Sequence, residues 1–228
     1  FQCDARILEL NSYENRVYQI GIEDDEPVIG KFYRPERWTE SQILEEHTYT
    51  QLLADSDISA VPPLIIDGST LHEFDGYRFS LSPRRGGRAP AVDDLNTLEV
   101  LGSHIGRIHA VAGDGGFTYR PLFGLQEFGL DARDAVVAAG YIPAELMPAF
   151  DSLYDGILAD LAALFERVSV NTLRLHGDCH MGNVLWRDDL PHFVDFDDAR
   201  SGPAIQDLWM MLSGEREQQQ NQMTYILR

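Results

Sequence analysis

The segment from His176 to Asn183 holds the polar side chains whose types and spacing most clearly suggest chemistry. It reads His-Gly-Asp-Cys-His-Met-Gly-Asn, and it places Asp178 and Asn183 on one predicted loop, with Asp195 beyond a short predicted hairpin. Amide and carboxylate oxygens suit Mg²⁺, which proteins hold with one or two carboxylates plus substrate phosphates. A further carboxylate kept off the metal can orient a hydroxyl group and accept its proton. These residues therefore suggest transfer of a phosphoryl group to an alcohol.

Phosphoryl transfer also needs a cation for the nucleotide phosphates, and Lys31 is the candidate. Lys31 is the only lysine of the chain, and it stands on a predicted strand ahead of a predicted helix that carries Glu45 and Glu46. The pattern His-x-Asp-x-x-x-x-Asn has the spacing of the kinase catalytic loop. A strand lysine, a helical glutamate, this loop and a strand-end aspartate, in that order, predict a kinase.

Other interpretations of the same residues stay open at this point. His176, Asp178 and His180 have a spacing that could hold zinc or a dinuclear metal centre in a hydrolase. A module that binds a partner without catalysis is a third possibility. Lys31 could also be an ordinary solvated strand residue, although its being the only lysine argues against this.

The composition excludes several classes of protein. The chain has 228 residues, and its 37 acidic against 18 basic residues give a net charge of −19. Such a surface repels phosphate backbones, so we expect no nucleic-acid partner. No apolar run is long enough to span a bilayer, so we expect no membrane association. Two cysteines, Cys3 and Cys179, are too few for a disulfide framework and point to a reducing compartment. We expect a cytoplasmic monomer.

The elements that must position these residues divide into two groups. In the first, residues 15–22 and 28–33 predict a hairpin around an acidic turn, with Lys31 on the return strand. Thr39 and Gln42 have capping-box spacing, which predicts a helix to about Ala54. A further strand is predicted over residues 76–82.

Beyond a Gly/Arg-rich hinge the pattern becomes helical. Leucine and isoleucine recur at helical spacing over residues 95–108, and an apolar stripe over residues 150–168 is expected to be core. Residues 173–175 predict a strand leading into the polar loop, and residues 184–186 and 192–195 predict a hairpin. The last helix is predicted from Glu215 to Arg228.

The chain resembles the aminoglycoside phosphotransferase/choline kinase-like family, and within it the bacterial stress response kinase A group of serine/threonine protein kinases. The segments that carry the resemblance are residues 10–19, 31–38, 42–47, 173–180, 182–187, 193–200 and 207–209. The resemblance implies an α+β, two-lobed protein-kinase-like fold with ATP and Mg²⁺ as cofactors. The expected parts are a nucleotide-binding lobe over residues 1–82, a hinge over 83–90, and a catalytic lobe over 91–228 that is incomplete at its end.

The resemblance also implies a role for each candidate residue. Asp178 would be the catalytic base, and Asn183 and Asp195 would hold Mg²⁺, which makes Asp195 catalytic as well. Lys31 would contact the α- and β-phosphates and pair with a glutamate of the following helix. Glu46 fits that position better than Glu45, because it stands seven residues before Leu53 as in the family pattern.

Two positions depart from the protein-kinase pattern. In place of a glycine-rich loop the chain has Asn-Ser-Tyr-Glu-Asn over residues 11–15, and Ser12 would sit at the phosphates. Asp197 stands where protein kinases have glycine, as a further metal ligand or a surface charge. The acceptor implied is a serine or threonine hydroxyl on a protein in a stress response. The alternative acceptor is a small alcohol such as an aminoglycoside, choline or a sugar.

Overall fold

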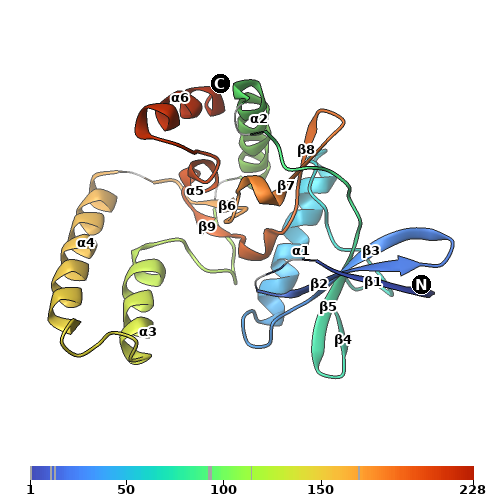
Figure 1. Cartoon of the computed structure of the whole chain (residues 1–228), viewed down its shortest axis with the longest axis horizontal. Helices are drawn as coiled ribbons and strands as arrows, with labels where there is room; N and C mark the ends of the chain where they lie inside the picture. The colour runs from blue at the N-terminus through green and yellow to red at the C-terminus, as the bar shows by residue number, and fades with distance from the viewer. Residues whose placement is uncertain (1, 11, 13, 92–93, 114, 169) are drawn as a thin grey trace.

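A five-stranded antiparallel sheet forms the N-terminal part of the computed structural model, which describes residues 2–10, 12, 14–91, 94–113, 115–168 and 170–228 (Figure 1). Its strands are β1 (Cys3–Leu10), β2 (Arg16–Ile22), β3 (Asp25–Phe32), β4 (His72–Phe74) and β5 (Tyr77–Pro83). They lie in the order β1-β2-β3-β5-β4, so β3 is central. On β3, Lys31 is paired with Val17 of β2 on one side and with Ser80 of β5 on the other. A central strand fixes the backbone of the lysine on both sides.

Helix α1 (Glu40–Asp55) lies between the sheet and the rest of the chain. Its start confirms the predicted capping box: the Thr39 hydroxyl accepts from the backbone N–H of Gln42, and the Gln42 side chain accepts from the N–H of Thr39. Its buried face combines apolar and polar side chains, namely Ile43, Glu46, His47, Tyr49, Thr50 and Leu53. Two buried ionisable groups on one helix need partners, and those partners define the site described below.

The C-terminal part is mostly helical and encloses short strands. Its α-helices are α2 (Leu95–Ala112), α3 (Ala132–Ala138), α4 (Met147–Arg167), α5 (Ile205–Trp209) and α6 (Arg216–Ile226), and a π-helical segment, η1 (Gln126–Asp131), precedes α3. The short elements are β6 (Leu173–Leu175), η2 (Met181–Asn183), β7 (Val184–Arg187), β8 (Leu190–Phe193), η3 (Phe196–Asp198) and β9 (Arg200–Gly202). The expected β-rich N-terminal part and helical C-terminal part are confirmed, whereas the lobe boundaries stay a prediction.

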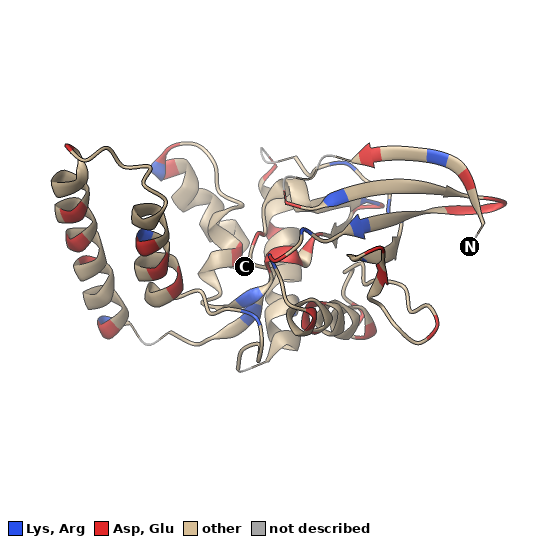
Figure 2. Cartoon of the chain, turned by 90° about the horizontal axis from the view of Figure 1, so that it is seen from below, with Lys and Arg blue, Asp and Glu red and all other residues tan. Residues whose placement is uncertain are grey.

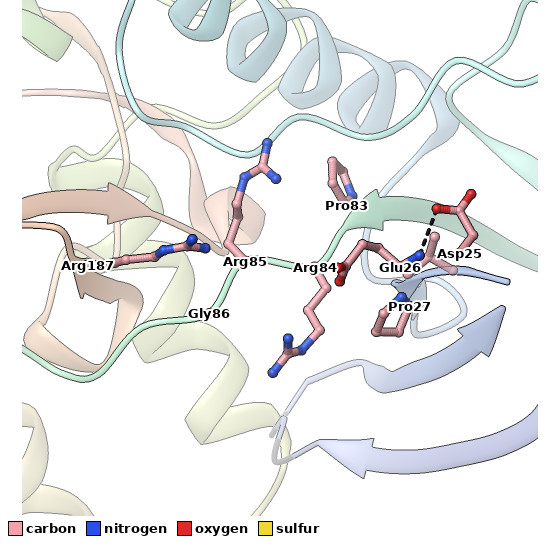
Figure 3. Close-up of a pocket in the computed structure, with 9 residues that line it drawn as sticks. Asp25, Glu26, Pro27, Pro83, Arg84, Arg85, Gly86 and Arg187 are labelled. Carbon is pink, nitrogen blue, oxygen red and sulfur yellow. Dashed lines mark hydrogen bonds between the residues drawn. The ribbon is translucent and has the colours of Figure 1, made fainter.

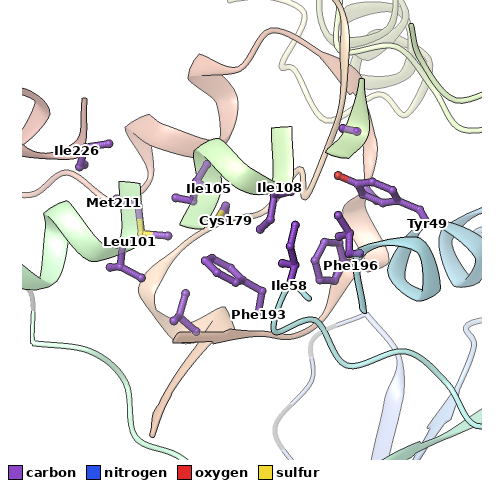
Figure 4. Close-up of a cluster of buried hydrophobic side chains, with 14 of the residues drawn as sticks. Tyr49, Ile58, Leu101, Ile105, Ile108, Cys179, Phe193, Phe196, Met211 and Ile226 are labelled. Atoms are coloured by element: carbon purple, nitrogen blue, oxygen red, sulfur yellow. The ribbon is translucent and has the colours of Figure 1, made fainter. Parts of the chain in front are cut away.

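The main hydrophobic core lies where α1, α2 and the β7–β8 hairpin meet (Figure 4). Tyr49 and Leu53 of α1 pack with a row of α2 side chains, and Phe193 and Phe196 close the cluster from the hairpin side. The α2 row comprises Leu98, Leu101, Ile105, Ile108 and Ala112, all of them buried. The core therefore ties the helix beside Lys31 to the hairpin that precedes Asp195.

The segment predicted to be the hinge is hydrogen-bonded to β7. The backbone groups of Arg88 and Trp186 exchange two hydrogen bonds, of 3.2 and 2.7 Å. Gly87 lies against Leu185 so closely that an added Cβ would stand 2.7 Å from the Leu185 Cβ. This close approach to β7 requires glycine at position 87.

Helix α4 does not behave as predicted. Its apolar stripe was expected to be core, but only Leu158 is buried, while Leu153 and Leu164 are 67% and 50% exposed. Among the described residues the helix is contacted chiefly by the η1–α3 segment, through Tyr154 on the carbonyl of Gly129 and an ion pair of Arg133. Figure 1 shows α3 and α4 standing together, apart from the core. Amphipathic spacing identified the helix, but it does not identify what the helix packs against.

Strand β1 was not predicted, and the acidic turn is shorter than predicted because β3 already begins at Asp25. Figure 2 shows that the acidic residues are spread over both ends of the molecule. In the ranges that the structure describes, the helices are all too short or too polar to cross a bilayer.

Candidate active site

The loop after β6 holds Asp178 and Asn183 in contact. The amide nitrogen Nδ2 of Asn183 donates to the backbone carbonyl of Asp178 at 2.9 Å and to its Oδ2 at 3.2 Å. Both amide protons are thereby used on Asp178, so the remaining polar atom of Asn183, the acceptor Oδ1, is the one that suits a cation. The Asp178 side chain is 35% exposed, which leaves its carboxylate accessible to a hydroxyl group.

Asp195 lies beside this loop through the β7–β8 hairpin. The N–H of Val194 donates to the carbonyl of Asn183 at 3.0 Å, so the residue before Asp195 is bonded to the loop that carries Asp178 and Asn183. Asp195 itself has left-handed backbone angles (φ 61°, ψ 61°), which aspartate tolerates better than most residues. An added Cβ on Gly177 would collide with the carbonyl of Asp198, so the loop and the segment after Asp195 pack directly against each other. The structure thus brings the three candidates of the C-terminal part together.

Lys31 reaches across from β3 to this group. Its Nζ lies 3.2 Å from Oδ1 of Asp195 and 2.8 Å from Oδ1 of Asp197. Burial by itself lowers the pKa of Lys31, but the charges of Asp197, Asp195 and Glu46 outweigh it and hold the pKa well above its usual value. The ammonium is therefore charged at neutral pH. The lysine and aspartates predicted from separate segments form one cluster.

The two glutamates of α1 have different partners. Glu46 is buried on the side of Lys31, and its charge raises the pKa of that lysine, as expected for the residue chosen from the sequence. The predicted ion pair is not formed in the described part of the chain: Lys31 contacts Asp195 and Asp197, and the nearest cation to Glu46 is Arg120, with Nη2 3.8 Å from Oε2. The physical reason is that two carboxylates beside the Lys31 ammonium already neutralise it.

Asp197 is not a surface charge, and its carboxylate is already in contact with basic side chains. Only 5% of its side chain is exposed, and its carboxylate faces Lys31 and Arg37. Burial acts to raise the pKa of Asp197, but the Lys31 charge, with smaller contributions from Arg37 and Arg120, lowers it to about 2. Asp197 is thus a buried anion that holds the lysine beside Asp195.

Asp207 of α5 was missed as a site residue. It is 1% exposed, and its carboxylate accepts from the backbone N–H groups of His176 and Gly177 at 3.0 and 2.9 Å and from the ring of His109 at 3.0 Å. Two backbone donors on one buried carboxylate hold the start of the loop that carries Asp178 in place. The signal available in the sequence was an isolated aspartate in an apolar stretch after Pro203.

Ser12 lies between β1 and β2, at the end of the sheet where Val17 stands opposite Lys31. Its hydroxyl accepts from the backbone N–H of Asn15 at 3.3 Å, which is a local turn contact. Its neighbours Asn11 and Tyr13 lie outside the described residues. Contact of Ser12 with phosphates stays a prediction.

The two histidines of the loop have roles that do not suit zinc. His176 donates from Nε2 to the carbonyl of Val194 at 3.0 Å, and its Nδ1 faces the N–H of Asp178 at 3.4 Å, so both ring nitrogens are occupied. His180 accepts from the N–H of Gly182 at Nδ1, and its Nε2 stands 3.5 Å from Oδ2 of Asp178. Across the described ranges no group of three or more His, Cys, Asp or Glu side chains has the arrangement of metal ligands.

A pocket of about 330 Å³ lies at the hinge, outside this cluster (Figure 3). Arg84, Arg85 and Arg187 line it together with the start of β3. Figure 3 shows the guanidinium groups of Arg84 and Arg85 pointing in different directions, and Arg84 donates to the Gln19 side chain at 2.9 Å. These arginines do not converge on a single anion.

A sheet that carries the partly buried Lys31, together with a helical part that presents Asp178, Asn183 and Asp195, defines a protein of the kinase-like fold class. The family model described as the phosphotransferase enzyme family matches residues 6–228, and the chain belongs to that family.

Curated relatives of the chain carry kinase names. Stress response kinase A of Escherichia coli O157:H7 is 44% identical over 226 residues, which cover 99% of this chain and 68% of the relative. The serine/threonine protein kinase RdoA of Salmonella typhimurium (strain LT2) is 43% identical over 224 residues, covering 98% of this chain and 68% of the relative.

Solved structures share the fold at low sequence identity. An amicoumacin kinase, hAmiN, solved with AMP-PNP, Ca²⁺ and Ami, has a TM-score of 0.80 at 19% identity and covers 99% of this chain and 72% of its own. A microcompartment-associated aminopropanol kinase has a TM-score of 0.71 at 17% identity, covering 99% of this chain and 75% of its own. At these identities the likeness establishes the fold alone, which is the protein-kinase-like fold that the sequence predicted.

Proposed function

We propose that the chain is an ATP- and Mg²⁺-dependent phosphotransferase that phosphorylates serine or threonine hydroxyls on proteins. The observation that carries the proposal is the contact of Lys31 with Asp195, next to a loop on which Asn183 holds Asp178. The identity of 43–44% with relatives named as stress response and serine/threonine kinases supports the protein acceptor.

The residues present fit a divalent cation and a nucleotide. Oδ1 of Asn183 and the half-exposed carboxylate of Asp195 would hold Mg²⁺, completed by phosphate oxygens. When bound, the metal would neutralise charge that develops on the transferred group. Lys31, the one lysine of the chain, would add a compact positive charge at the phosphates.

Asp178 performs the proton transfer in this proposal. Its carboxylate orients the acceptor hydroxyl and takes its proton as the hydroxyl oxygen forms a bond to the γ-phosphorus. The bond from that phosphorus to the bridging oxygen breaks, and ADP leaves with its electron pair. Asn183 and His180 both face Oδ2 of Asp178, so Oδ1 is the oxygen that would receive the proton.

The single lysine makes a sharp test of the nucleotide site possible. An acyl phosphate of ATP transfers its acyl group to an amine near the phosphates, and Lys31 is the only side-chain amine of the chain. We expect one acylated lysine by peptide mass spectrometry, and we expect Mg²⁺–ATP to protect it. Absence of labelling, or labelling that Mg²⁺–ATP does not suppress, would contradict a nucleotide site at Lys31.

The acceptor class requires a separate experiment. The protein is incubated with radiolabelled ATP and either a dephosphorylated protein mixture or the small alcohols choline, kanamycin and fructose. Phosphoserine or phosphothreonine on protein is the expected product. Transfer to a small alcohol alone would keep the phosphotransferase and overturn the protein acceptor.

A further inference from the structure

Arg120 lies at a junction that the kinase motifs do not include. It belongs to an irregular segment before η1, and its side chain is fully buried. The backbone N–H groups of Thr118, Tyr119 and Arg120 all donate to the carboxylate of Glu45, at 2.5 to 2.9 Å. Three backbone donors on one charged acceptor fasten this segment to α1.

The guanidinium of Arg120 joins α1 to the segment that follows Asp195. Its Nε donates to the carbonyl of Gln42 on α1 at 2.9 Å. Its Nη1 donates to the carbonyls of Asp197 and Ala199, the latter at 3.1 Å. The ring of Trp38 covers its face, with the guanidinium carbon 4.5 Å from the ring. A planar fork of five donors can serve several carbonyls at once, which a lysine ammonium cannot do in the same geometry.

The remaining nitrogen of the fork faces Glu46. Nη2 of Arg120 and Oε2 of Glu46 are buried, have no hydrogen-bond partner among the described residues, and lie 3.8 Å apart. Buried charged atoms without partners are costly unless an opposite charge is near. Their mutual attraction therefore draws Arg120 toward α1 while its Nη1 holds the carbonyls of Asp197 and Ala199.

These contacts act on a strained part of the backbone. Asp195 has left-handed angles, and such a conformation persists only where the surroundings fix it. The carbonyls that Arg120 binds lie two and four residues beyond Asp195, at the end of the turn that aims its carboxylate. Arg200 also binds this turn, through Asp198. Because Arg200 follows Asp198 by only two residues, this contact is local and does not join the turn to α1.

We propose that Arg120 is a positioning residue that sets the affinity of the site for its divalent cation by fixing the Asp195–Ala199 turn to α1. This inference rests on the proposed function, because it takes Asp195 as a metal ligand. Residues that orient metal ligands through hydrogen bonds typically change metal affinity by 10–100-fold when they are replaced.

The test measures metal binding without turnover, in the whole chain. Mn²⁺ is titrated into the protein with AMP-PNP, and free Mn²⁺ is followed by electron paramagnetic resonance. We expect Arg120→Lys to bind AMP-PNP without metal within about 2-fold of the wild type, and to weaken Mn²⁺ binding on the order of 10-fold.

Arg174→Lys is the matched control. Arg174 is partly buried, donates from two nitrogens to the carbonyl of Ala112, and lies over the ring of Tyr49, but it joins β6 to α2 rather than to the Asp195 turn. We expect its Mn²⁺ affinity to stay within about 2-fold of the wild type. Equal weakening in both variants would overturn the proposal, as would an unchanged Arg120→Lys.

Glu45→Gln keeps the proposal testable if Arg120→Lys fails to fold. It weakens the attachment of the same segment to α1 without removing the guanidinium. We therefore expect weaker Mn²⁺ binding than in the wild type, and unchanged binding would overturn the proposal.

The two levels of the proposal fail in different ways. Failure of the wild-type protein to bind Mn²⁺ with AMP-PNP would overturn the proposed function itself. Wild-type binding that neither variant changes would overturn only the role of Arg120.

Discussion

Acidification from pH 7 to pH 5 should destabilise the protein through His47, which lies one residue from Glu46 on the buried face of α1. The ring is 2% exposed, and both of its nitrogens meet hydroxyl groups: Nε2 lies 2.7 Å from the Tyr33 oxygen and Nδ1 lies 2.8 Å from that of Thr70. Burial lowers the pKa of His47 to about 3, and the nearby positive charge of Lys31 adds to the effect.

The size and sign of the effect follow from proton linkage. In the unfolded chain the pKa of His47 returns to its ordinary value of 6.5, so below that pH the unfolded state binds the proton that the folded state refuses. The contribution of His47 to the free energy of unfolding is therefore fully present above pH 6.5 and is lost as the pH falls toward 3. At pH 5 the loss corresponds to about 1.5 pH units, or about 2 kcal/mol in the free energy of unfolding.

The assay is urea unfolding at pH 7 and pH 5 of the wild type, His47→Gln and a control, His104→Gln. His104 lies on α2, and among the described residues its ring is hydrogen-bonded to the carbonyl of Val100 in its own helix. Between pH 7 and pH 5, we expect the free energy of unfolding of the wild type and of the control to fall by about 2 kcal/mol more than that of His47→Gln. Equal losses in all three proteins would refute the assignment of a neutral, buried His47.

Two further predictions concern Asp207, which holds the loop that carries Asp178, and Gly87, which lies against β7. Asp207→Asn replaces one carboxylate oxygen by an NH2 group, so one of the backbone N–H groups of His176 and Gly177 loses its acceptor. The free energy of unfolding should fall by about 1–3 kcal/mol in urea titrations, and an unchanged midpoint would contradict the holding role of Asp207. Gly87→Val forces a side chain onto β7 and should lower the free energy of unfolding by about 1–3 kcal/mol through overpacking. A Cβ at Gly86 meets nothing within 4 Å, so the control Gly86→Val should be nearly neutral. Thermal denaturation of both variants measures the difference.

Local patterns singled out several of the residues that the structure brings together. The spacing from Asp178 to Asn183 and the strand-end position of Asp195 are set within short segments, and the structure brings these residues to the lysine of β3. The capping box of α1 was equally visible, because its two residues lie three apart in the sequence.

Other features depend on contacts that no local pattern records. Arg120 meets α1 and the Asp195 turn across 77 to 79 residues of sequence, so nothing near it in the chain signals its burial. Strand β1 is exposed along most of its length and therefore lacks the alternation that marks a half-buried strand. Asp197 could not be placed because its burial depends on the side chains of Lys31 and Arg37 from the other part of the molecule.

The central claim is that Asp178 is the base of a phosphoryl transfer, and the rate of γ-phosphoryl transfer by Asp178→Asn tests it most directly. The matched control is Asp188→Asn, an exposed carboxylate in the β7–β8 turn. Loss of a general base lowers rates by about 10²–10⁴-fold, so Asp178→Asn should lose transfer on that scale, and we expect ATP to bind it within a few-fold of the wild type. The control should transfer phosphate at the wild-type rate. Undiminished transfer by Asp178→Asn would contradict the role of Asp178 as the base.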